Sequence, residues 1–362
     1  MYDMFRVLLT CIAATILTLL LTPVVKRLAI KSNAIDKPNE RRINKKPIPT
    51  LGGVAIFLSF FFCVFFLLPI PNKEIFPILA SSLVVMATGI VDDIKELSPK
   101  GKAAGIIIAA VLLFFTSNIR MDMLSLPYFG NIYFGAFSLP LTIFWILAIT
   151  NAVNLIDGLD GLASGVSMIA LLTMGTIGYF FLTTDSITVP IMIFVLVGSI
   201  AGFLPYNFYP ASIFLGDTGA LFIGFMISLL SLQGLKNATL ITFIIPIIIL
   251  GIPITDTLYA IIRRKMNRQP ISSADKLHIH HRLMTFGLTH RQTVLAIYCL
   301  AGIFSVIALL YPISTFWGSL LLTLGLLFGL ELFVEIIGLT GPDRQPLLKQ
   351  LRSFAKNLNR KR

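Results

Sequence analysis

The sequence predicts an all-α, polytopic integral membrane protein, and three observations support this fold class. Of the 362 residues, 56% are hydrophobic and only 13% are charged, a composition outside the range of soluble domains. Apolar stretches long enough to cross a bilayer recur along the whole chain. The lysines and arginines are concentrated in alternate loops, as in the cytosolic loops of membrane proteins.

About eleven segments qualify as transmembrane helices. They cover roughly residues 3–25, 51–70, 76–91, 103–117, 138–154, 162–182, 187–205, 217–234, 239–262, 292–312 and 315–337. We therefore predict one transmembrane domain over residues 1–337. A basic cytosolic tail over residues 338–362 follows it, with apolar residues at helical spacing that suit an amphipathic helix on anionic head groups. A frayed tail is the alternative.

The basic residues also predict the orientation of the chain. One alternating set of loops, together with the tail, holds every lysine and arginine except Arg6, Lys73, Arg120 and Lys236. By the positive-inside rule this set is cytosolic, so the amino terminus lies outside and the carboxyl terminus in the cytosol. The net charge of +12 is thus a topology signal, and it does not require a nucleic-acid partner.

Polar residues gather at the predicted cytosolic ends of the spans. The stretch VDDIKELSPKGK (91–102) places the adjacent Asp92 and Asp93 at a helix end, where a solvated pair is the ordinary interpretation. The stretch FLGDTGALFIG (214–224) places Asp217 at a helix start, where an N-cap would account for it. Neither motif alone predicts a function.

The motif NAVNLIDGLDGLASG (151–165) lies between two strongly apolar segments. Its polar residues Asn154, Asp157 and Asp160 are three positions apart and share one face of a helical turn. A carboxylate in hydrocarbon costs several kcal/mol, and glycine-broken backbone at this depth is tolerated where it lines a wet cavity. A glycine-rich turn would explain the glycines but not the acids.

The longest polar segment between spans, RRKMNRQPISSADKLHIHHRL (263–283), holds three of the four histidines among arginines. It lacks the i, i+4 histidine pair and the cysteines of a zinc site. Arginine and imidazole donors suit an anionic, phosphate-bearing ligand. The aromatic loop PYNFYPA (205–211) is suited to holding a base or other ring of a ligand. The oxygen donors of the other motifs suit Mg²⁺. Acids for a metal and a basic loop for phosphates together indicate phosphoryl transfer.

These four motifs, in their order along the chain (91–102, 151–165, 214–224 and 263–283) and on one side of the membrane, resemble the polyprenyl-phosphate N-acetylhexosamine-1-phosphate transferases, the MraY, WecA and TagO family. The similarity runs from about RRINKKPIPTLGG (41–53) to His281. It implies ten or eleven transmembrane helices around a cytosol-facing cleft in a bacterial plasma membrane. It also implies a reaction with Mg²⁺, or alternatively Mn²⁺, in which undecaprenyl phosphate attacks the sugar-linked phosphate of a UDP-amino sugar and UMP is released.

The resemblance assigns catalytic and metal-binding roles residue by residue. Asp217 matches the metal-binding aspartate, and Asn154 matches a position that ligates metal in some members. Asp92 and Asp93 match an acidic pair that handles the lipid phosphate or the metal. Which of the two acts as the base is left open.

The remaining matches concern the donor substrate. The nucleotide pocket corresponds to Asp157, Asp160, Asn207 and Phe214, the last by stacking on uracil. The positions that hold the phosphates or cover the diphosphate and amino sugar correspond to Lys45, Lys46, Lys102, His278, His280, His281 and Arg282.

The histidine loop also suggests the sugar. ADKLHIHHRL is similar to the WecA/TagO branch, which uses UDP-N-acetylglucosamine, whereas phospho-N-acetylmuramoyl-pentapeptide transferases typically show three successive histidines followed by Phe-Glu. Asn44 and Thr50 depart from the usual His and Arg of the branch, which affects local phosphate or lipid contacts. The muramoyl-pentapeptide reaction is the alternative within the family.

Two other classes of function remain as alternatives. A secondary transporter would keep its coupling residues near the bilayer midplane, whereas most acids here lie at one face; a lipid-binding scaffold would not need the metal-type cluster. The exceptions to the one-sided distribution are Asp256, Glu331 and Glu335, which we interpret as bundle-facing structural or lipid-site groups. A homodimer is left open.

Overall fold

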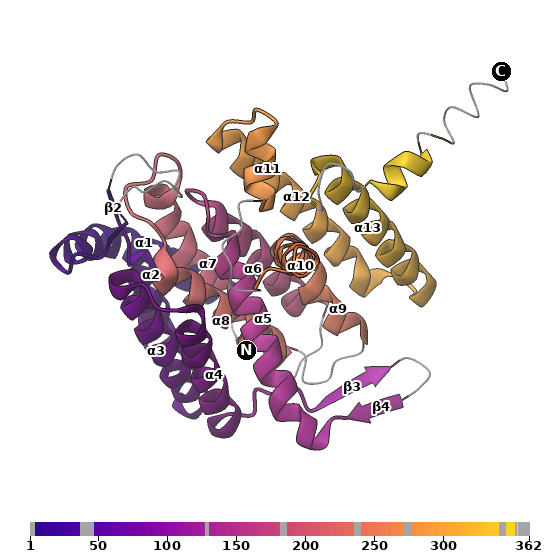
Figure 1. The fold of residues 1–362 in the computed structure, drawn as a ribbon. Coiled ribbons are helices and arrows are strands. Elements are labelled where there is room, and N and C mark those ends of the chain that lie inside the picture. Colours follow the sequence, from indigo (N-terminus) through magenta and orange to yellow (C-terminus); the bar gives the residue numbers. More distant parts are fainter. Residues whose placement is uncertain are drawn as a thin grey trace.

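The computed structural model describes residues 4–36, 47–126, 130–181, 187–234, 240–270, 277–339, 345–351 and 353. It is a bundle of helices (Figure 1), which confirms the all-α prediction. The long helices are α1 (Met4–Lys31), α2 (Gly52–Leu67), α3 (Asn72–Lys95), α4 (Pro99–Thr116), α5 (Ser138–Ile156), α6 (Leu162–Phe180), α7 (Thr188–Asn207), α8 (Gly216–Gly234), α9 (Leu240–Ile249), α10 (Gly251–Met266), α12 (His290–Leu310) and α13 (Phe316–Ile337).

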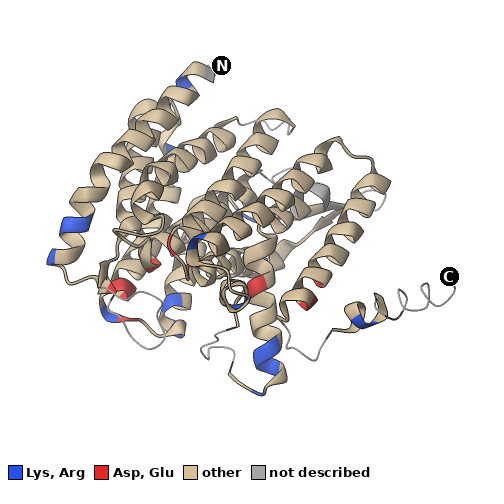
Figure 2. Cartoon of the chain, turned by 90° about the horizontal axis from the view of Figure 1, so that it is seen from above, with Lys and Arg blue, Asp and Glu red and all other residues tan. Residues whose placement is uncertain are grey.

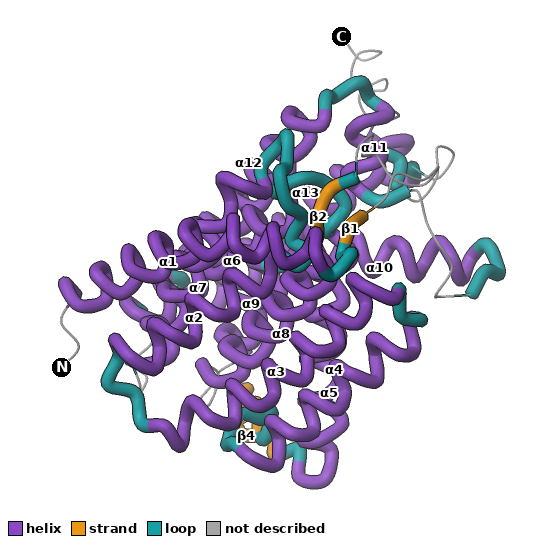
Figure 3. Tube along the Cα trace, turned by 90° about the vertical axis from the view of Figure 1, so that its left-hand side faces the viewer, coloured by secondary structure: helices purple, strands orange, loops and turns teal. Residues whose placement is uncertain are grey.

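Short elements complete the described part of the chain. They are the helix α11 (Ile279–Thr285), the 3₁₀ turns η1 (Gly135–Phe137) and η2 (Tyr311–Ile313), and the strands β1 (Ile35–Asp36), β2 (Ile48–Pro49), β3 (Met123–Leu126) and β4 (Gly130–Tyr133). β1 pairs with β2 and β3 with β4, both antiparallel. The β3–β4 hairpin precedes the start of α5, whereas β1–β2 lies at the other end of the bundle (Figure 3).

Nine helices within the described ranges are long and apolar enough to cross a membrane. α2 is apolar but has only 16 residues. The ninth predicted span, 239–262, is not one helix: it breaks at Leu250 into α9 and α10. Pro253 contributes to this break because it has no amide hydrogen to donate within the helix. The basic last turn of α10, which ends at Met266, extends beyond residue 262, the predicted end of the span.

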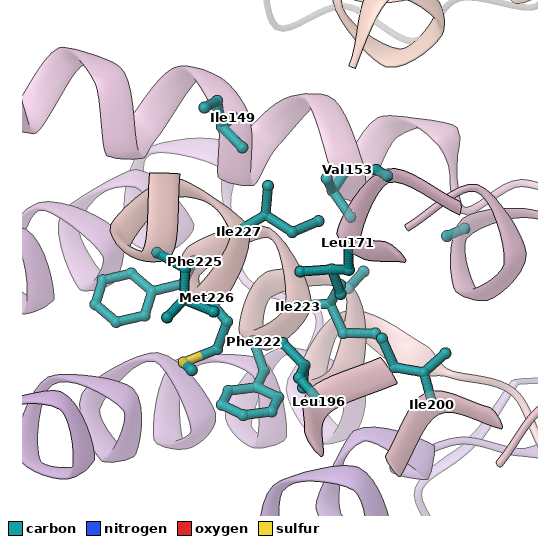
Figure 4. Close-up of a cluster of buried hydrophobic side chains, with 14 of the residues drawn as sticks. Ile149, Val153, Leu171, Leu196, Ile200, Phe222, Ile223, Phe225, Met226 and Ile227 are labelled. Atoms are coloured by element: carbon teal, nitrogen blue, oxygen red, sulfur yellow. The ribbon is translucent and has the colours of Figure 1, made fainter. Parts of the chain in front are cut away.

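α8 is the centre of the bundle, and it packs against α2, α3, α5, α6 and α7. Its apolar face includes Phe222, Ile223 and Ile227, which meet Val153 of α5 and Leu196 of α7 in a buried cluster (Figure 4). By contrast, α13 buries few residues, namely Ser319, Val334, Glu335 and Ile337, as expected for a helix that faces lipid. Charged residues lie largely toward one end of the long helices (Figure 2).

Glycines allow the start of α8 to lie directly against α2 and α3. A Cβ on Gly53 of α2 would lie 2.2 Å from the Cα of Gly219 in α8. A Cβ on Gly89 of α3 would lie 2.4 Å from the Cα of Thr218. At such distances backbone meets backbone, and no side chain can move aside to make room.

We expect Gly89→Ala to destabilise the protein by about 1–3 kcal/mol, because the added methyl group must push α3 away from α8. The measurement is the melting temperature of the detergent-purified protein. The matched control is Gly325→Ala in α13, where an added Cβ would have no atom within 4 Å. Equal melting temperatures for the two variants would contradict the close contact of α3 and α8.

Candidate active site

A cavity of about 1530 Å³ opens at the end of the bundle where α8 begins. Residues of all four sequence motifs line this cavity, although the motifs lie far apart along the chain. The predicted site residues that line it are Asp92, Asp93, Lys102, Asn154, Asp157, Asp160, Asn207, Phe214, Asp217, His278, His280 and His281. The sequence-based grouping of these twelve residues into one site is therefore reproduced by the fold.

Asp93 holds the amino-terminal end of α8. Its Oδ1 accepts a hydrogen bond from the amide of Asp217 at 3.0 Å, and its Oδ2 accepts from the amide of Thr218 at 3.0 Å and from the Thr218 hydroxyl at 2.5 Å. Gly216 adopts a φ of 72°, and a Cβ there would lie 2.6 Å from Asp93 Oδ2. Both oxygens of Asp93 are thus used to fix the helix that carries Asp217.

Lys102 lies between the carboxylates of Asp92 and Asp217. Its ammonium group contacts Asp92 Oδ2 and is 3.1 Å from Asp217 Oδ1. The amide of Asn154 donates to the same Asp217 oxygen at 2.5 Å. Ser98 caps α4 by accepting from the Gly101 amide at 3.2 Å, which sets the helix that presents Lys102. One cation is therefore shared between two acids, one from α3 and one from α8.

Asp157 and Asp160 differ in their contacts. Asp160 Oδ2 accepts from the Ala211 amide at 2.9 Å, and its own amide donates to His290 Nε2 at 3.0 Å. The Asp157 carboxylate accepts no hydrogen bond from the described part of the chain. Burial and the charges of Asp217, Asp93 and Asp160 raise the pKa of Asp157 well above its ordinary value. Asp160 ties two loops together, whereas Asp157 is available to a ligand.

The three histidines of the predicted loop lie side by side. The rings of His278 and His280 are parallel, with centroids 5.9 Å apart, and the ring of His281 is 4.2 Å from that of His280. His280 packs on Gly158, where a Cβ would lie 2.6 Å from its ring. Burial and the neighbouring His281, His278 and His290 lower the pKa of His280 to about 3, so its ring is neutral.

Asn207 and Phe214 also line the cavity. The Asn207 amide accepts from the Ser164 hydroxyl at 2.8 Å and donates to the Ile213 carbonyl at 3.2 Å, which uses the side chain to hold its own loop. The Phe214 amide donates to the Pro49 carbonyl at 2.8 Å, and the Phe214 carbonyl accepts from Gly52. These bonds fasten the loop to β2 and α2 and set the ring of Phe214 at the cavity.

Comparison with known proteins gives the family. The sequence profile of glycosyl transferase family 4 matches residues 75–235, from α3 to α8. The chain is 42% identical, over 98% of both chains, to the "probable undecaprenyl-phosphate N-acetylglucosaminyl 1-phosphate transferase" of Bacillus subtilis strain 168. The chain belongs to glycosyl transferase family 4.

Two further relatives of this family 4 chain have related names. The "decaprenyl-phosphate N-acetylglucosaminephosphotransferase" of Mycobacterium tuberculosis is 33% identical over 81% of this chain and 79% of its own. The "undecaprenyl-phosphate alpha-N-acetylglucosaminyl 1-phosphate transferase" of Salmonella typhi is 30% identical over 88% of this chain and 89% of its own. Membership of this family confirms the resemblance that the motifs indicated.

Two predicted residues of the family 4 site are not among the described cavity residues. Arg282 follows the histidines in sequence, but its Nε donates to the Ile337 carbonyl at 2.8 Å, so it holds the end of α13. Lys46, with its neighbour Lys45, lies outside the described residues. Thr50, a departure from the branch pattern, lines the cavity, and its hydroxyl donates to the Ala34 carbonyl at 3.2 Å.

His290 and Tyr209 line the family 4 site but were not predicted. Their rings stack with centroids 4.5 Å apart, and His290 also accepts the Asp160 amide hydrogen. In sequence His290 marks only a helix start, because Thr289 and Gln292 form a capping box around it. Tyr209 belongs to the aromatic loop PYNFYPA (205–211), and this composition was the sequence feature that could have indicated a role for Tyr209 in the site.

The raised pKa of Asp157 predicts a pH-dependent gain in stability for Asp157→Asn. The folded protein holds the Asp157 proton more tightly than the unfolded chain, so the wild type loses stability as pH rises above the ordinary value of 3.8. Asparagine does not titrate. We expect the melting temperature of the variant to exceed that of the wild type by more at about pH 8 than at about pH 4.

The comparison variant is Asp160→Asn. It replaces the carboxylate that accepts the Ala211 amide hydrogen and so weakens that hydrogen bond, and we expect it to lower the melting temperature. A difference between Asp157→Asn and wild type that is the same at both pH values would contradict the assigned environment of Asp157.

Proposed function

We propose that this chain transfers N-acetylglucosamine 1-phosphate from UDP-N-acetylglucosamine to undecaprenyl phosphate. An oxygen of the lipid phosphate forms a bond to the β-phosphorus of the donor, and the bond from that phosphorus to the bridging oxygen breaks. UMP leaves, and undecaprenyl-diphospho-N-acetylglucosamine remains, the first lipid-linked sugar of a cell-envelope polysaccharide. The observation that carries the proposal is the 42% identity over nearly the full length to the Bacillus subtilis relative whose name states that activity.

The charge of the cavity supports a divalent cation as cofactor. Seven acidic side chains and two lysines line it within the described part of the chain. Additional positive charge would offset the repulsion between these acids and an anionic substrate. No group of three or more His, Cys, Asp or Glu side chains among the described residues forms a ready metal cluster. That fits Mg²⁺, which uses one or two carboxylates and takes its other ligands from water and substrate phosphates; Mn²⁺ is the alternative.

Asp217 and Asn154 are the residues that would hold this ion. Asn154 donates its amide hydrogen to Asp217, so the Asn154 oxygen remains available as a second ligand. The ion, when bound, would neutralise the charge that develops on the transferring phosphoryl group. Lys102 adds a fixed positive charge beside the same oxygens.

Within the acidic pair, the contacts favour Asp92 as the residue that handles the lipid phosphate. Both Asp93 oxygens accept hydrogen bonds from the start of α8. Asp92 faces Lys102, and among the described residues the Leu97 amide donates to its Oδ1 at 2.6 Å. Asp92 can therefore orient the acceptor phosphate or take its proton, while Lys102 offsets the repulsion between carboxylate and phosphate.

The donor end of the site follows from the remaining residues. Phe214 offers a ring at the cavity wall for uracil, and Asp157 offers hydrogen-bonding oxygens nearby. The neutral His280 and its two histidine neighbours form the wall suited to the diphosphate and amino sugar. We place the active site on the cytosolic side of the bacterial plasma membrane, with the amino terminus outside, because the positive-inside rule puts the basic loops in the cytosol and Lys26 and Lys102 at their ends line the cavity.

The decisive test supplies the purified protein with undecaprenyl phosphate, Mg²⁺ and one of two donors, and measures UMP. We expect turnover with UDP-N-acetylglucosamine and none with UDP-N-acetylmuramoyl-pentapeptide, which is the donor of the alternative reaction. Turnover of only the second donor would contradict the sugar assignment. Turnover of neither would favour the transporter alternative.

The same assay includes two matched variants. Asp217→Asn is expected to lose at least about 100-fold in turnover, because the metal loses its anionic ligand. Asp122→Asn is expected to keep wild-type turnover, because Asp122 lies beside β3 at the opposite end of the bundle and its side chain is 53% exposed.

A further inference from the structure

Asp256 is a buried carboxylate that the proposed reaction does not use. It lies in α10, six residues beyond the break at Leu250, and is only 2% exposed. A carboxylate in such a place is costly unless hydrogen bonds compensate its charge. Both of its oxygens contact the histidine loop, which is about twenty residues further along the chain. Oδ2 is 2.8 Å from His278 Nδ1, and Oδ1 accepts the Ile279 amide hydrogen at 2.8 Å.

This pair fixes how His278 faces the cavity. A carboxylate accepts only, so the His278 Nδ1 beside it carries a hydrogen and donates it. The other ring nitrogen, Nε2, is then the one left for a ligand, and His278 lines the cavity. The ring of His278 is parallel to that of His280, which packs on Gly158 of the Asp157 loop. The orientation of the His278 ring therefore affects how the rings of His280 and His281 lie as well.

We propose that Asp256 is a positioning residue: its carboxylate accepts the Nδ1 hydrogen of His278 and so orients the ring with Nε2 toward the nucleotide-sugar donor. The proposal rests on the proposed function for the identity of that donor. The Asp256 charge also balances an imidazolium, which can donate from Nε2 to a phosphate oxygen. The break between α9 and α10 contributes, because it lets the buried start of α10 turn Asp256 toward α11.

A purely structural role is the competing explanation, since Asp256 also accepts the first amide hydrogen of α11. Asp256→Asn separates the two roles. The asparagine has nearly the same size and keeps an oxygen for the Ile279 amide. Its NH₂ group, however, presents donors to His278 Nδ1 where the carboxylate presented an acceptor, which disfavours the original tautomer.

The test is a double-mutant cycle of Asp256→Asn and His278→Ala, with kcat/KM for UDP-N-acetylglucosamine as the readout. We expect Asp256→Asn alone to lower kcat/KM on the order of tenfold, and to cause no further loss when His278 is already alanine. Equal losses in both backgrounds would overturn the proposal, because Asp256 would then act independently of His278. An unchanged kcat/KM for the single variant would overturn it as well.

A control and a second readout separate this proposal from the proposed function. Glu331→Gln changes a carboxylate that bonds to Tyr259 of α10 and not to the histidine loop, so we expect kcat/KM to stay at the wild-type value. If the wild type does not turn over UDP-N-acetylglucosamine, the proposed function fails, and the cycle is repeated with the Kd of UDP measured by calorimetry. Asp256→Asn then weakens UDP binding only when His278 is present; unchanged binding overturns the positioning role.

Discussion

The carboxylate of Asp93 at the amino-terminal end of α8 is the contact on which the site depends. It accepts two backbone amide hydrogens and one hydroxyl hydrogen from Asp217 and Thr218. A negative charge at this end of a helix is favoured by the helix dipole, and hydrogen bonds to it are strong where water is scarce. Because α8 is also the centre of the bundle, fixing its first turn fixes the position of Asp217 relative to α3, α4 and α5.

That contact brings acids together that would otherwise repel one another. The structure compensates each of them differently: Asp93 by the start of α8, Asp92 and Asp217 by Lys102, and Asp160 by the Ala211 amide. Asp157 has no such partner among the described residues, and burial together with the charges of Asp217, Asp93 and Asp160 raises its pKa. An anionic substrate and a divalent cation complement a cavity of this kind, because the cation supplies the charge that the protein lacks.

Composition and motif order predicted much of this structure. Apolar length gave the helices, since the cost of exposed backbone in lipid leaves a membrane chain few other choices. The four motifs predicted which residues line one cavity, because their positions at one end of alternate spans bring them to the same face. The predicted grouping of Asn154 with Asp217, which are 63 residues apart, rested on the family resemblance.

The details that sequence did not predict all depend on contacts between distant segments. Nothing local distinguishes Asp157 from Asp160, because only the folded chain brings the Ala211 amide and His290 to the second of them. Arg282 is adjacent to the histidines in sequence, yet the short helix α11 turns it toward the end of α13. Asp256 and His278 pair across 22 residues of sequence, and hydrophobicity alone did not reveal the break at Leu250 because both halves belong to one apolar stretch.

The central claim is that the adjacent Asp92 and Asp93 have different tasks, the first in the reaction and the second in holding α8. Asp92→Asn and Asp93→Asn, compared in melting temperature and in kcat with saturating substrates, test it most directly. The account predicts that Asp92→Asn loses most of kcat and lowers the melting temperature less than Asp93→Asn does, whereas Asp93→Asn lowers the melting temperature by an amount equivalent to about 1–3 kcal/mol. A normal melting temperature for Asp93→Asn, together with a destabilised Asp92→Asn, would contradict it.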